Sequence, residues 1–358
     1  MKISTIVDDK EKRVAITPET TKKYVQLGFE VVLPQSIGVY SGFQDEEYLA
    51  AGATMWKKKT IPEAELYLCV KPSFEKDIIK LKSGSYLVAM LSPFQNKAVL
   101  EEMLKQGINL CALEKIPRIT RAQSMDVLSS QANISGYRAV LEALLEYRRV
   151  IPLMMTAAGT IRPARVLVLG AGVAGLQAIA TAKRLGAIVS AFDVRAAAKE
   201  QVESLGASFV EVENTDNGET LGGYAKEMND DYKKRQSEKL IQIFPKVDIA
   251  ITTAQIPGKP APILITEEMV ALMSAGSVIV DMSTETGGNC EVSKRNEVIQ
   301  FKGVTIIGYT DFAARVAYDS SQLFARNVFN FVSLMAKDGK IDISDEIVQS
   351  TLIRVQHG

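Results

Sequence analysis

Apolar residues recur along the chain in short runs that alternate with helical patterns. In the first third, four runs predict strands, at 30–34, 66–71, 86–91 and 109–114. Residues 19–28 and 96–107 have helical spacing, and each segment closes on a glycine, as helices commonly do. Strands that alternate with helices predict a parallel sheet covered on both faces. We expect this first unit to end near residue 125.

A second alternating set follows a helical pattern at 132–146 and predicts another parallel sheet. Its apolar runs are RVLVLG at 165–170, AIVSAFD at 187–193, SFVEV at 208–212, DIAITTA at 248–254, SVIVDM at 277–282 and VTIIGY at 304–309. A last helix, roughly 321–337, places its apolar residues mostly on one face. Because it comes so late, this helix could return to the first domain.

Two segments interrupt the alternation. Residues 148–163 contain an apolar stretch and a glycine turn, which predicts a hairpin-like excursion. Exposed apolar strands favour a contact with a second chain, and packing on the chain's own core is the alternative. Residues 216–239 are the most polar stretch, and a long polar loop in a compact domain is usually functional or mobile.

Composition narrows the class of protein. The 358 residues suggest two domains, and 42 basic against 42 acidic residues leave no net charge to attract nucleic acid or an anionic membrane. The three cysteines show neither metal-ligand spacing nor a disulfide framework, so we expect no metal and a reducing compartment. The N-terminal residues contain no apolar signal core.

The strongest local motif is a glycine-rich turn between two expected strands. Gly170, Gly172 and Gly175 have G-x-G-x-x-G spacing, and Asp193 follows at the end of the next strand. The first glycine permits a tight turn, the second lets a pyrophosphate approach and the third lets helix and strand pack closely. This context predicts a dinucleotide site. A carboxylate at Asp193 repels a 2′-phosphate and favours NAD(H). The positive charge of Arg195 could instead favour NADP(H), or Arg195 could be a surface charge.

An acid–base group for ordinary dehydrogenation is hard to find. The one histidine, His357, lies beside the C-terminus, where residues are usually frayed. Lys71 could take its place, or could be a solvated residue at a strand end. Hydride transfer between two nicotinamides needs no proton transfer, so the missing histidine fits a reaction of that kind.

The chain also resembles a known family, through motifs that occur in order from end to end. They are RVAITPE, RITRAQSMDVLSSQANISGYRAV, MMTAAGTIRPARVLVLGAGVAGLQAIATAKRLGA, FDVR, GGYAKEM, ITTAQIPGKPAP and DMSTETGGN. Together they are similar to the NAD(H)-binding component, domain I, of proton-translocating NAD(P) transhydrogenase, in the alanine dehydrogenase superfamily. The resemblance implies an α/β protein with two Rossmann-like domains, parallel sheets flanked by helices and an NAD site in the cleft between them.

The resemblance implies domain bounds and partners as well. The first domain comprises 1–128 plus 313–358, and the second, 129–312, carries the hairpin of a homodimer contact and a mobile loop at about 216–232. NADP(H) is expected on a partner subunit, domain III. A membrane-spanning domain II is expected to couple hydride transfer to proton movement. The chain would then be cytoplasmic, held on a bacterial-type inner membrane through these partners.

Site residues follow from the same resemblance. Residues 118–131, taken alone, could be a solvated loop, but the family's loop folds over the nicotinamide. The residues that this implies at the ring are Arg118, Gln123, Asp126 and Ser129. The cofactor-binding residues implied elsewhere are Gly170, Gly172, Val173, Ala174, Gly175, Asp193, Val194, Arg195, Gly223, Tyr224, Gln236 and Gln255.

The sequence differs from alanine dehydrogenases at some positions and matches them at others, which bears on the choice between possible functions. Ser92 stands where alanine dehydrogenases have a catalytic histidine, and Glu285 replaces an acid common there. Arg13 and Lys71 match residues that bind the substrate carboxylate in those enzymes. A soluble alanine dehydrogenase using Lys71 therefore remains the alternative, and a non-catalytic NAD-binding regulator is a third possibility.

Overall fold

The chain forms two compact units. The computed structural model describes residues 1–6, 10–57, 61–74, 81–212, 228–256, 258–337 and 340–354. Unit 1 comprises residues 1–131 and 313–358, and unit 2 comprises residues 132–312. The expected first boundary, after residue 128, lies three residues before the observed one. Gly223, Tyr224 and most of the expected mobile loop fall outside the described residues.

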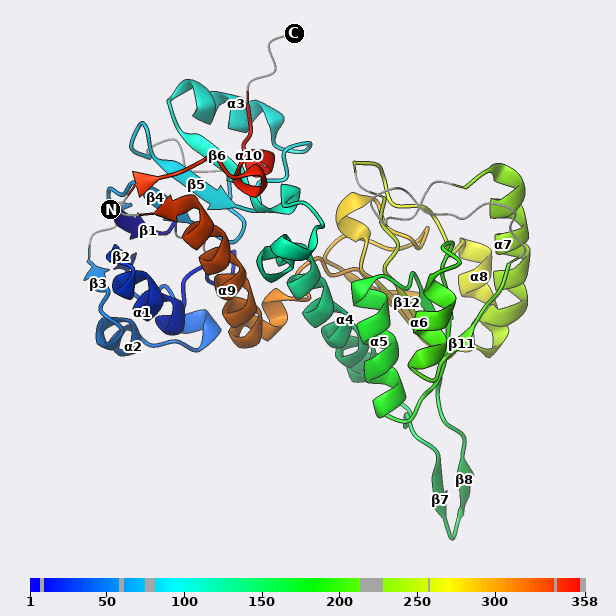
Figure 1. Ribbon diagram of the computed structural model, residues 1–358. Helices are drawn as coiled ribbons and strands as arrows, with labels where there is room; N and C mark the ends of the chain where they lie inside the picture. The colour runs from blue at the N-terminus through cyan, green and yellow to red at the C-terminus, as the bar shows by residue number, and fades with distance from the viewer. Residues whose placement is uncertain are drawn as a thin grey trace. The chain divides into compact units, whose positions relative to one another are not determined.

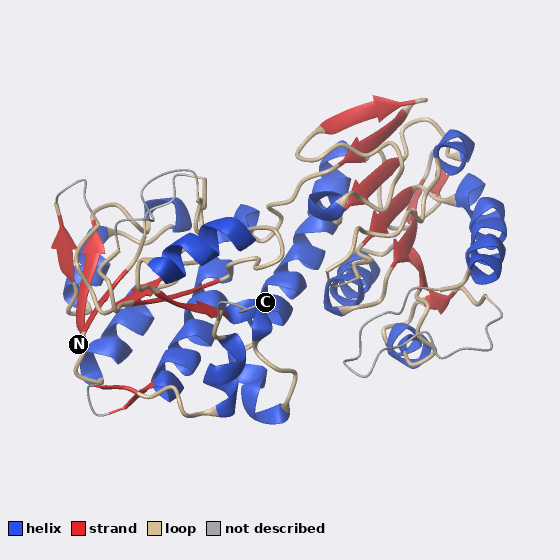
Figure 2. Ribbon diagram, turned by 90° about the horizontal axis from the view of Figure 1, so that it is seen from above, coloured by secondary structure: helices blue, strands red, loops and turns tan. Residues whose placement is uncertain are grey.

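Unit 1 is built on a six-stranded parallel sheet. In spatial order the strands are β3 (Thr54–Trp56), β2 (Glu30–Pro34), β1 (Lys2–Ser4), β4 (Leu66–Leu68), β5 (Tyr86–Ala89) and β6 (Asn109–Ala112). Its helices are α1 (Pro18–Gln26), α2 (Asp45–Ala50), α3 (Lys97–Lys105), α9 (Ala317–Met335) and α10 (Glu346–Thr351), with a short hairpin of β16 (Ala336–Lys337) and β17 (Lys340–Ile341). Helices lie on both faces of the sheet (Figure 2).

Helix α9 completes this unit from the far end of the chain. Phe324, Val328, Phe331 and Met335 are fully buried, and they pack in the same core as the strands β1, β2 and β4. Their spacing of three and four residues places them on one helix face, so burial of that face ties the C-terminal segment to the first unit.

Unit 2 has a seven-stranded sheet. Its strands in spatial order are β11 (Ser208–Phe209), β10 (Ile188–Phe192), β9 (Arg165–Leu169), β12 (Ile249–Thr252), β13 (Val278–Asp281), β15 (Val304–Ile307) and β14 (Val298–Phe301). Neighbouring strands are parallel except β14, which pairs antiparallel with β15. The helices are α4 (Val127–Glu146), which begins in unit 1, α5 (Val173–Arg184), α6 (Ala198–Ser204), α7 (Asp230–Ile243) and α8 (Glu267–Leu272).

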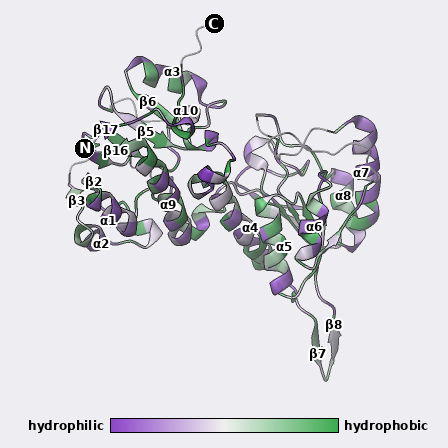
Figure 3. Ribbon diagram, viewed as in Figure 1, coloured by the Kyte–Doolittle hydropathy of each residue, from purple (hydrophilic) through white to green (hydrophobic). Residues whose placement is uncertain are grey.

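Strand β9 has a continuous apolar run because it is covered on both faces of the sheet. Val166 and Val168 belong to the core that includes α4, α5 and α6, whereas Leu167 and Leu169 belong to the core that includes α7 and α8. Successive side chains of a strand point to opposite faces, so a strand covered on both faces must be apolar throughout. Hydrophilic residues lie along α7 (Figure 3).

The strand orders confirm the expected fold class. Each sheet grows outward on one side of its first strand and then reverses to the other side, as doubly wound Rossmann-like sheets do. The reversal falls between β1 and β4 in unit 1 and between β9 and β12 in unit 2. In such sheets, ligands bind at the carboxyl ends of the strands beside the reversal.

Several expected element bounds were wrong. Helix α4 begins at Val127 rather than near residue 132, because the Asp126 side chain accepts the Ser129 N–H at 2.9 Å and caps the new helix. Helix α7 begins at Asp230, capped by Asn229, so residues 230–232 of the expected mobile loop are helical. The antiparallel edge strand β14 was not expected.

The expected hairpin is present. β7 (Met154–Thr156) and β8 (Gly159–Ile161) pair antiparallel and project from the rest of unit 2 (Figure 1). All six strand residues are exposed, and Met155 keeps 77% of its surface accessible. Within the described part of the chain, none of the helices combines the length and the hydrophobicity that a bilayer crossing demands.

Candidate functional site

The turn after β9 has the backbone that the glycine motif requires. Gly170 has a φ of +102°, which L-residues with a side chain rarely adopt. A Cβ at Gly175 would lie 1.8 Å from the Gly170 carbonyl oxygen, so only glycine lets the helix start pack against the turn. A Cβ at Gly172 would meet no atom within 4 Å, which leaves open space in front of this residue.

Helix α5 begins directly at this open space. Gly172 is its N-cap and supplies no side chain to cap the helix, so the first backbone N–H groups remain available to an anion. The positive end of the helix dipole points the same way. Val173 is exposed and Ala174 is half-buried, so both lie where a pyrophosphate could contact the turn. These residues fit a dinucleotide.

Asp193 lies at the end of β10 and is tied to the same turn. Its carboxylate accepts the Ala171 N–H at 2.7 Å and is buried to 9% exposure. Arg195 clasps it with two side-chain N–H groups, each at 2.9 Å, and with its backbone N–H. Arg195 is therefore paired with the acid rather than being a separate surface charge. Val194, between them, is half-buried.

The segment after β12 forms the other side of the turn. Thr253 donates its hydroxyl to the Gly170 carbonyl at 3.0 Å, and its N–H bonds Leu169 at 2.8 Å. Gln255 follows two residues later and is exposed. The strand reversal of unit 2 thus brings together Gly170, Asp193 and Gln255.

Gln236 was misplaced by the sequence reasoning. We expected it at the end of the mobile loop, but it lies inside α7 and is 7% exposed. The cause is the early start of α7, which carries Gln236 into the second turn and turns it inward. Gly223 and Tyr224 lie outside the described residues, so their expected roles stay predictions.

In unit 1, residues 118–131 form a 3-10 helix, η4 (Thr120–Met125), followed by the first turns of α4. Asp126 and Ser129 lie together, because the Ser129 hydroxyl donates to the Asp126 carboxylate at 2.6 Å. Arg118 and Gln123 are exposed. The segment is therefore an ordered turn with exposed polar side chains, Arg118 and Gln123 among them.

Two residues that the sequence reasoning missed hold this turn. Asn327 and Asn330, on α9, donate their side-chain amides to the Ser124 carbonyl oxygen at 2.8 and 3.0 Å. Asn327 also accepts the Ser130 hydroxyl at 2.7 Å. Their only sequence signal is a pair of amides three residues apart on an amphipathic helix.

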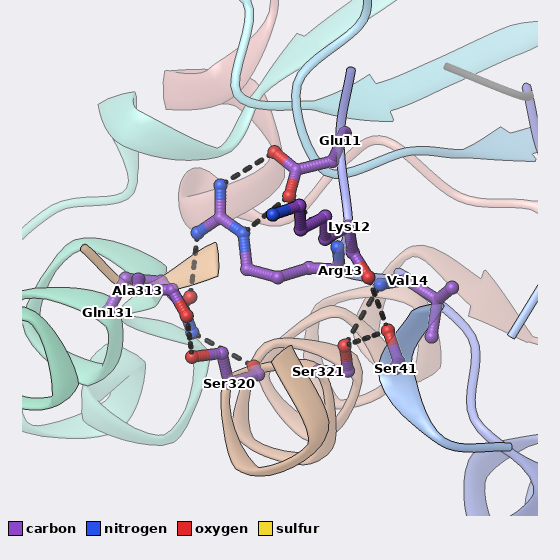
Figure 4. A network of polar contacts seen from close by, with 9 residues as sticks. All are labelled: Glu11, Lys12, Arg13, Val14, Ser41, Gln131, Ala313, Ser320 and Ser321. Carbon is purple, nitrogen blue, oxygen red and sulfur yellow. Dashed lines mark hydrogen bonds and ion pairs between the residues drawn. The ribbon is translucent and has the colours of Figure 1, made fainter. Parts of the chain in front are cut away.

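Unit 1 also has a cavity of about 220 Å³, lined by residues that follow β1 and β4 and by Glu11 and Arg13. Figure 4 shows the Arg13 guanidinium between the Glu11 carboxylate and the Gln131 side chain. The two side-chain Arg13–Glu11 bonds are each 2.8 Å long, and the pair is largely buried. An external carboxylate would have to compete with Glu11 for this arginine.

A second carboxylate, half-buried, belongs to Glu114, which follows β6. Glu114 accepts the N–H groups of Leu91 and Ser92. Burial raises the pKa of its carboxyl, and backbone hydrogen bonds and, after them, the charge of Lys71 oppose that shift. Ser92 has a φ of +48°. Among the described residues, there is no group of three or more histidine, cysteine or acidic side chains that could hold a metal ion.

Comparison with known proteins identifies the family. Residues 6–135 match the alanine dehydrogenase/PNT N-terminal domain, and residues 139–358 match its C-terminal domain. The chain is 49% identical over 356 residues to the first portion of the alpha subunit of NAD(P) transhydrogenase from Rhodospirillum rubrum, covering 96% of this chain and 93% of that one.

Structure and a more distant relative agree with this match. A transhydrogenase crystal structure from Sinorhizobium meliloti superposes with a TM-score of 0.89 at 43% identity and covers 98% of each chain. An alanine dehydrogenase of Mycolicibacterium smegmatis is 28% identical, over 82% of this chain and 74% of its own. The chain therefore belongs to the alanine dehydrogenase/PNT family and is more similar to these transhydrogenases than to that alanine dehydrogenase.

Proposed function

We propose that the protein is the NAD(H)-binding, hydride-transferring subunit of a proton-translocating NAD(P) transhydrogenase. The observation that carries this proposal is the turn at Gly170–Gly175, with open space at Gly172, an uncapped helix start and Asp193 beside it. That combination suits the pyrophosphate and ribose of a dinucleotide, and the relatives named for transhydrogenase give the reaction.

The chain's own residues divide the work in this proposal. The turn and the start of α5 bind the pyrophosphate, while Asp193, Val194 and Arg195 bind the adenosine ribose. Gln255, Gly223, Tyr224 and Gln236 belong to the same nucleotide site, and burial of Gln236 makes its contribution indirect. The reduced nicotinamide supplies the hydride.

Arg118, Gln123, Asp126 and Ser129 orient the nicotinamide. The exposed amide of Gln123 can hydrogen-bond a carboxamide, and Ser129 holds the carboxylate of Asp126 in place. Fixed orientation matters because hydride transfer between two rings depends on close approach of the reacting carbons. Within this reaction no residue has to take up a proton.

The proposal includes partners. A second copy of the chain covers the apolar hairpin of β7 and β8, giving a homodimer. NADP(H) binds to a separate subunit, which receives the hydride, and a membrane-spanning component couples the reaction to proton translocation. The protein would then work at the cytoplasmic face of a bacterial-type inner membrane through these partners.

A soluble alanine dehydrogenase is the second candidate, favoured by Arg13 and Lys71 and by the 28% identical relative. Two features weigh against it. Ser92 stands where those enzymes have histidine, and the Arg13 side chain is engaged by Glu11 within the chain.

One experiment separates the two functions. The full chain is mixed with a purified NADP(H)-binding transhydrogenase subunit, NADPH and an oxidised NAD analogue whose reduction is followed by absorbance. We expect reduction of the analogue only when both proteins are present. Oxidation of NADH by the chain alone with pyruvate and ammonia would instead support the alanine dehydrogenase, and NADH binding without either reaction would exclude both activities.

A further inference from the structure

Asp281 is a carboxylate sealed inside unit 2. It ends β13, is 0% exposed and satisfies its oxygens entirely with groups of the chain. Its hydrogen-bond donors are the backbone N–H groups of Ser283, Asn289 and Cys290 and the hydroxyl groups of Thr252 and Ser293, at 2.6 to 3.1 Å. A buried carboxylate is costly unless its hydrogen bonds are complete. Here four of the five donors fix the loop 283–293, and the fifth, Thr252, ties the carboxylate to β12.

Asn289 links this loop to the segment that follows the neighbouring strand β12. Its side chain is also fully buried. The amide nitrogen donates to the Ala254 carbonyl at 2.9 Å and to the Pro262 carbonyl at 2.7 Å, and the amide oxygen accepts the Ala254 N–H at 3.1 Å. One side chain thus holds both Ala254, next to Gln255, and Pro262.

The segment after β12 abuts the phosphate turn. Thr253, next to Ala254, bonds the Gly170 carbonyl, and a Cβ at Gly170 would lie 2.7 Å from the Thr253 hydroxyl and 3.1 Å from the Ala254 nitrogen. A shift of Ala254 by a few tenths of an ångström therefore moves a wall of the turn. A continuous line runs by hydrogen bonds from Asp281 through Asn289 to Ala254, and from its neighbour Thr253 to Gly170.

We infer that Asp281 and Asn289 are positioning residues for the dinucleotide, holding Ala254, Pro262 and the Gly170 turn in the binding geometry without touching the nucleotide. This inference rests on the proposed NAD(H) site. Asp281→Asn keeps the side chain's shape but sets an amide N–H against backbone N–H donors. Asn289→Ala removes three side-chain hydrogen bonds to Ala254 and Pro262 while leaving Asp281 and the Ser283 hydroxyl bond to the Ala254 carbonyl in place.

The test measures NADH affinity of the full chain by fluorescence titration, together with thermal unfolding. Each single variant should bind NADH about 10-fold more weakly or worse, as expected when a buried donor loses its partner. If the two residues act along one line, the double variant should lose little more than the weaker-binding single variant. Additive losses would overturn the coupling between them.

Asp248→Asn is the matched control. Asp248 is 2% exposed and directly precedes β12, so it lies at the amino ends of the parallel strands, whereas Asp281 lies at their carboxyl ends. The Arg162 side chain and the Arg165 backbone N–H donate to it. This variant should unfold at a lower temperature yet bind NADH with unchanged affinity.

The outcomes separate the inference from the function on which it rests. If Asp281→Asn and Asn289→Ala lower the unfolding temperature like the control but keep the parental NADH affinity, the two residues are merely structural and the inference is overturned. Should Asp281→Asn fail to fold, Asn289→Ala and its affinity decide. A parental chain that binds no NADH would overturn the proposed function, and the inference with it.

Discussion

Gly136 on α4 lies directly against Ala174 in the first turn of α5. A Cβ at residue 136 would lie 2.0 Å from the Ala174 carbonyl oxygen and 3.0 Å from its Cα. The helix that opens the proposed phosphate site is therefore packed against a glycine 38 residues earlier in the chain. That glycine belongs to no part of the nucleotide motif, yet it limits where the motif's helix can lie.

Gly136→Ala should consequently weaken nucleotide binding. The added methyl group must displace α5 or α4, and overpacking of this kind costs about 1 to 3 kcal/mol of stability. We expect a lower unfolding temperature and about 10-fold weaker NADH binding by fluorescence titration. Leu145→Ala, at a 72% exposed position on the same helix, should change neither quantity. Parental affinity in Gly136→Ala would show that α5 tolerates the shift.

Asp193 should govern the choice between NADH and NADPH. Its carboxylate repels a 2′-phosphate, although the paired Arg195 offsets part of that charge. Asp193→Asn should bind NADH about 10-fold more weakly, because the amide cannot accept both ribose hydroxyls and the Ala171 N–H. It should also narrow the ratio of the NADPH and NADH dissociation constants, measured by titration. Arg195→Gln is the control, because it retains the carboxylate of Asp193 and should not narrow that ratio. Equal ratios in the parent and in Asp193→Asn would contradict the role of Asp193 in selecting NADH over NADPH.

Asn327 should affect the rate of hydride transfer more than NADH affinity. Its amide fixes the Ser124 carbonyl, next to the proposed nicotinamide contact Gln123. Misplacement by about 1 Å can cost about 100-fold in rate, so Asn327→Ala should lower kcat with the partner subunit by about 10-fold or more. Its NADH dissociation constant should change by less than about threefold. Ser333→Ala is the control, because the Ser333 hydroxyl donates to the Phe329 carbonyl within the same helix. A loss confined to NADH affinity would argue against this role.

The hairpin should determine the oligomeric state. Met155 in the middle of β7 is 77% exposed, and a charge there would be buried in the proposed dimer. Met155→Asp should therefore shift the molar mass measured by light scattering from that of a dimer to that of a monomer. Leu272→Asp, on the exposed surface of α8, should leave the mass unchanged. A monomeric parent would refute the dimer outright.

The ion pair between exposed Arg162 and buried Asp248, at the base of the hairpin, predicts a pH dependence. Burial alone would raise the pKa of Asp248, but hydrogen bonds from Arg162 and Arg165 outweigh it and hold that pKa below its ordinary value of 3.8. A depressed pKa in the folded state means that the stabilisation is present above pH 3.8 and is lost as the pH falls below it. Parent and Asp248→Asn should thus differ in unfolding temperature at neutral pH and converge on acidification. A difference in unfolding temperature that stays the same at neutral and acidic pH would contradict the predicted direction of the effect.

Periodicity in the sequence by itself determined most of the secondary structure and the doubly wound fold. Apolar runs such as 165–170 are local, and an apolar strand between two helical patterns has few other ways to bury its side chains. The glycine turn was equally readable, because backbone freedom at Gly170 and close packing at Gly175 depend on near neighbours. The early start of α4 could have been read from Asp126 as a cap.

Tertiary structure alone decided the partners of the polar groups. Asn327 reaches a carbonyl 203 residues away, and Asn289 reaches one 35 residues away. The pairing of Arg13 with Glu11 rather than with an external acid also required side-chain geometry. Hydrophobic burial is non-directional and leaves a periodic trace in the chain, whereas a hydrogen bond depends on distance and angle between groups that only the folded sheet brings together.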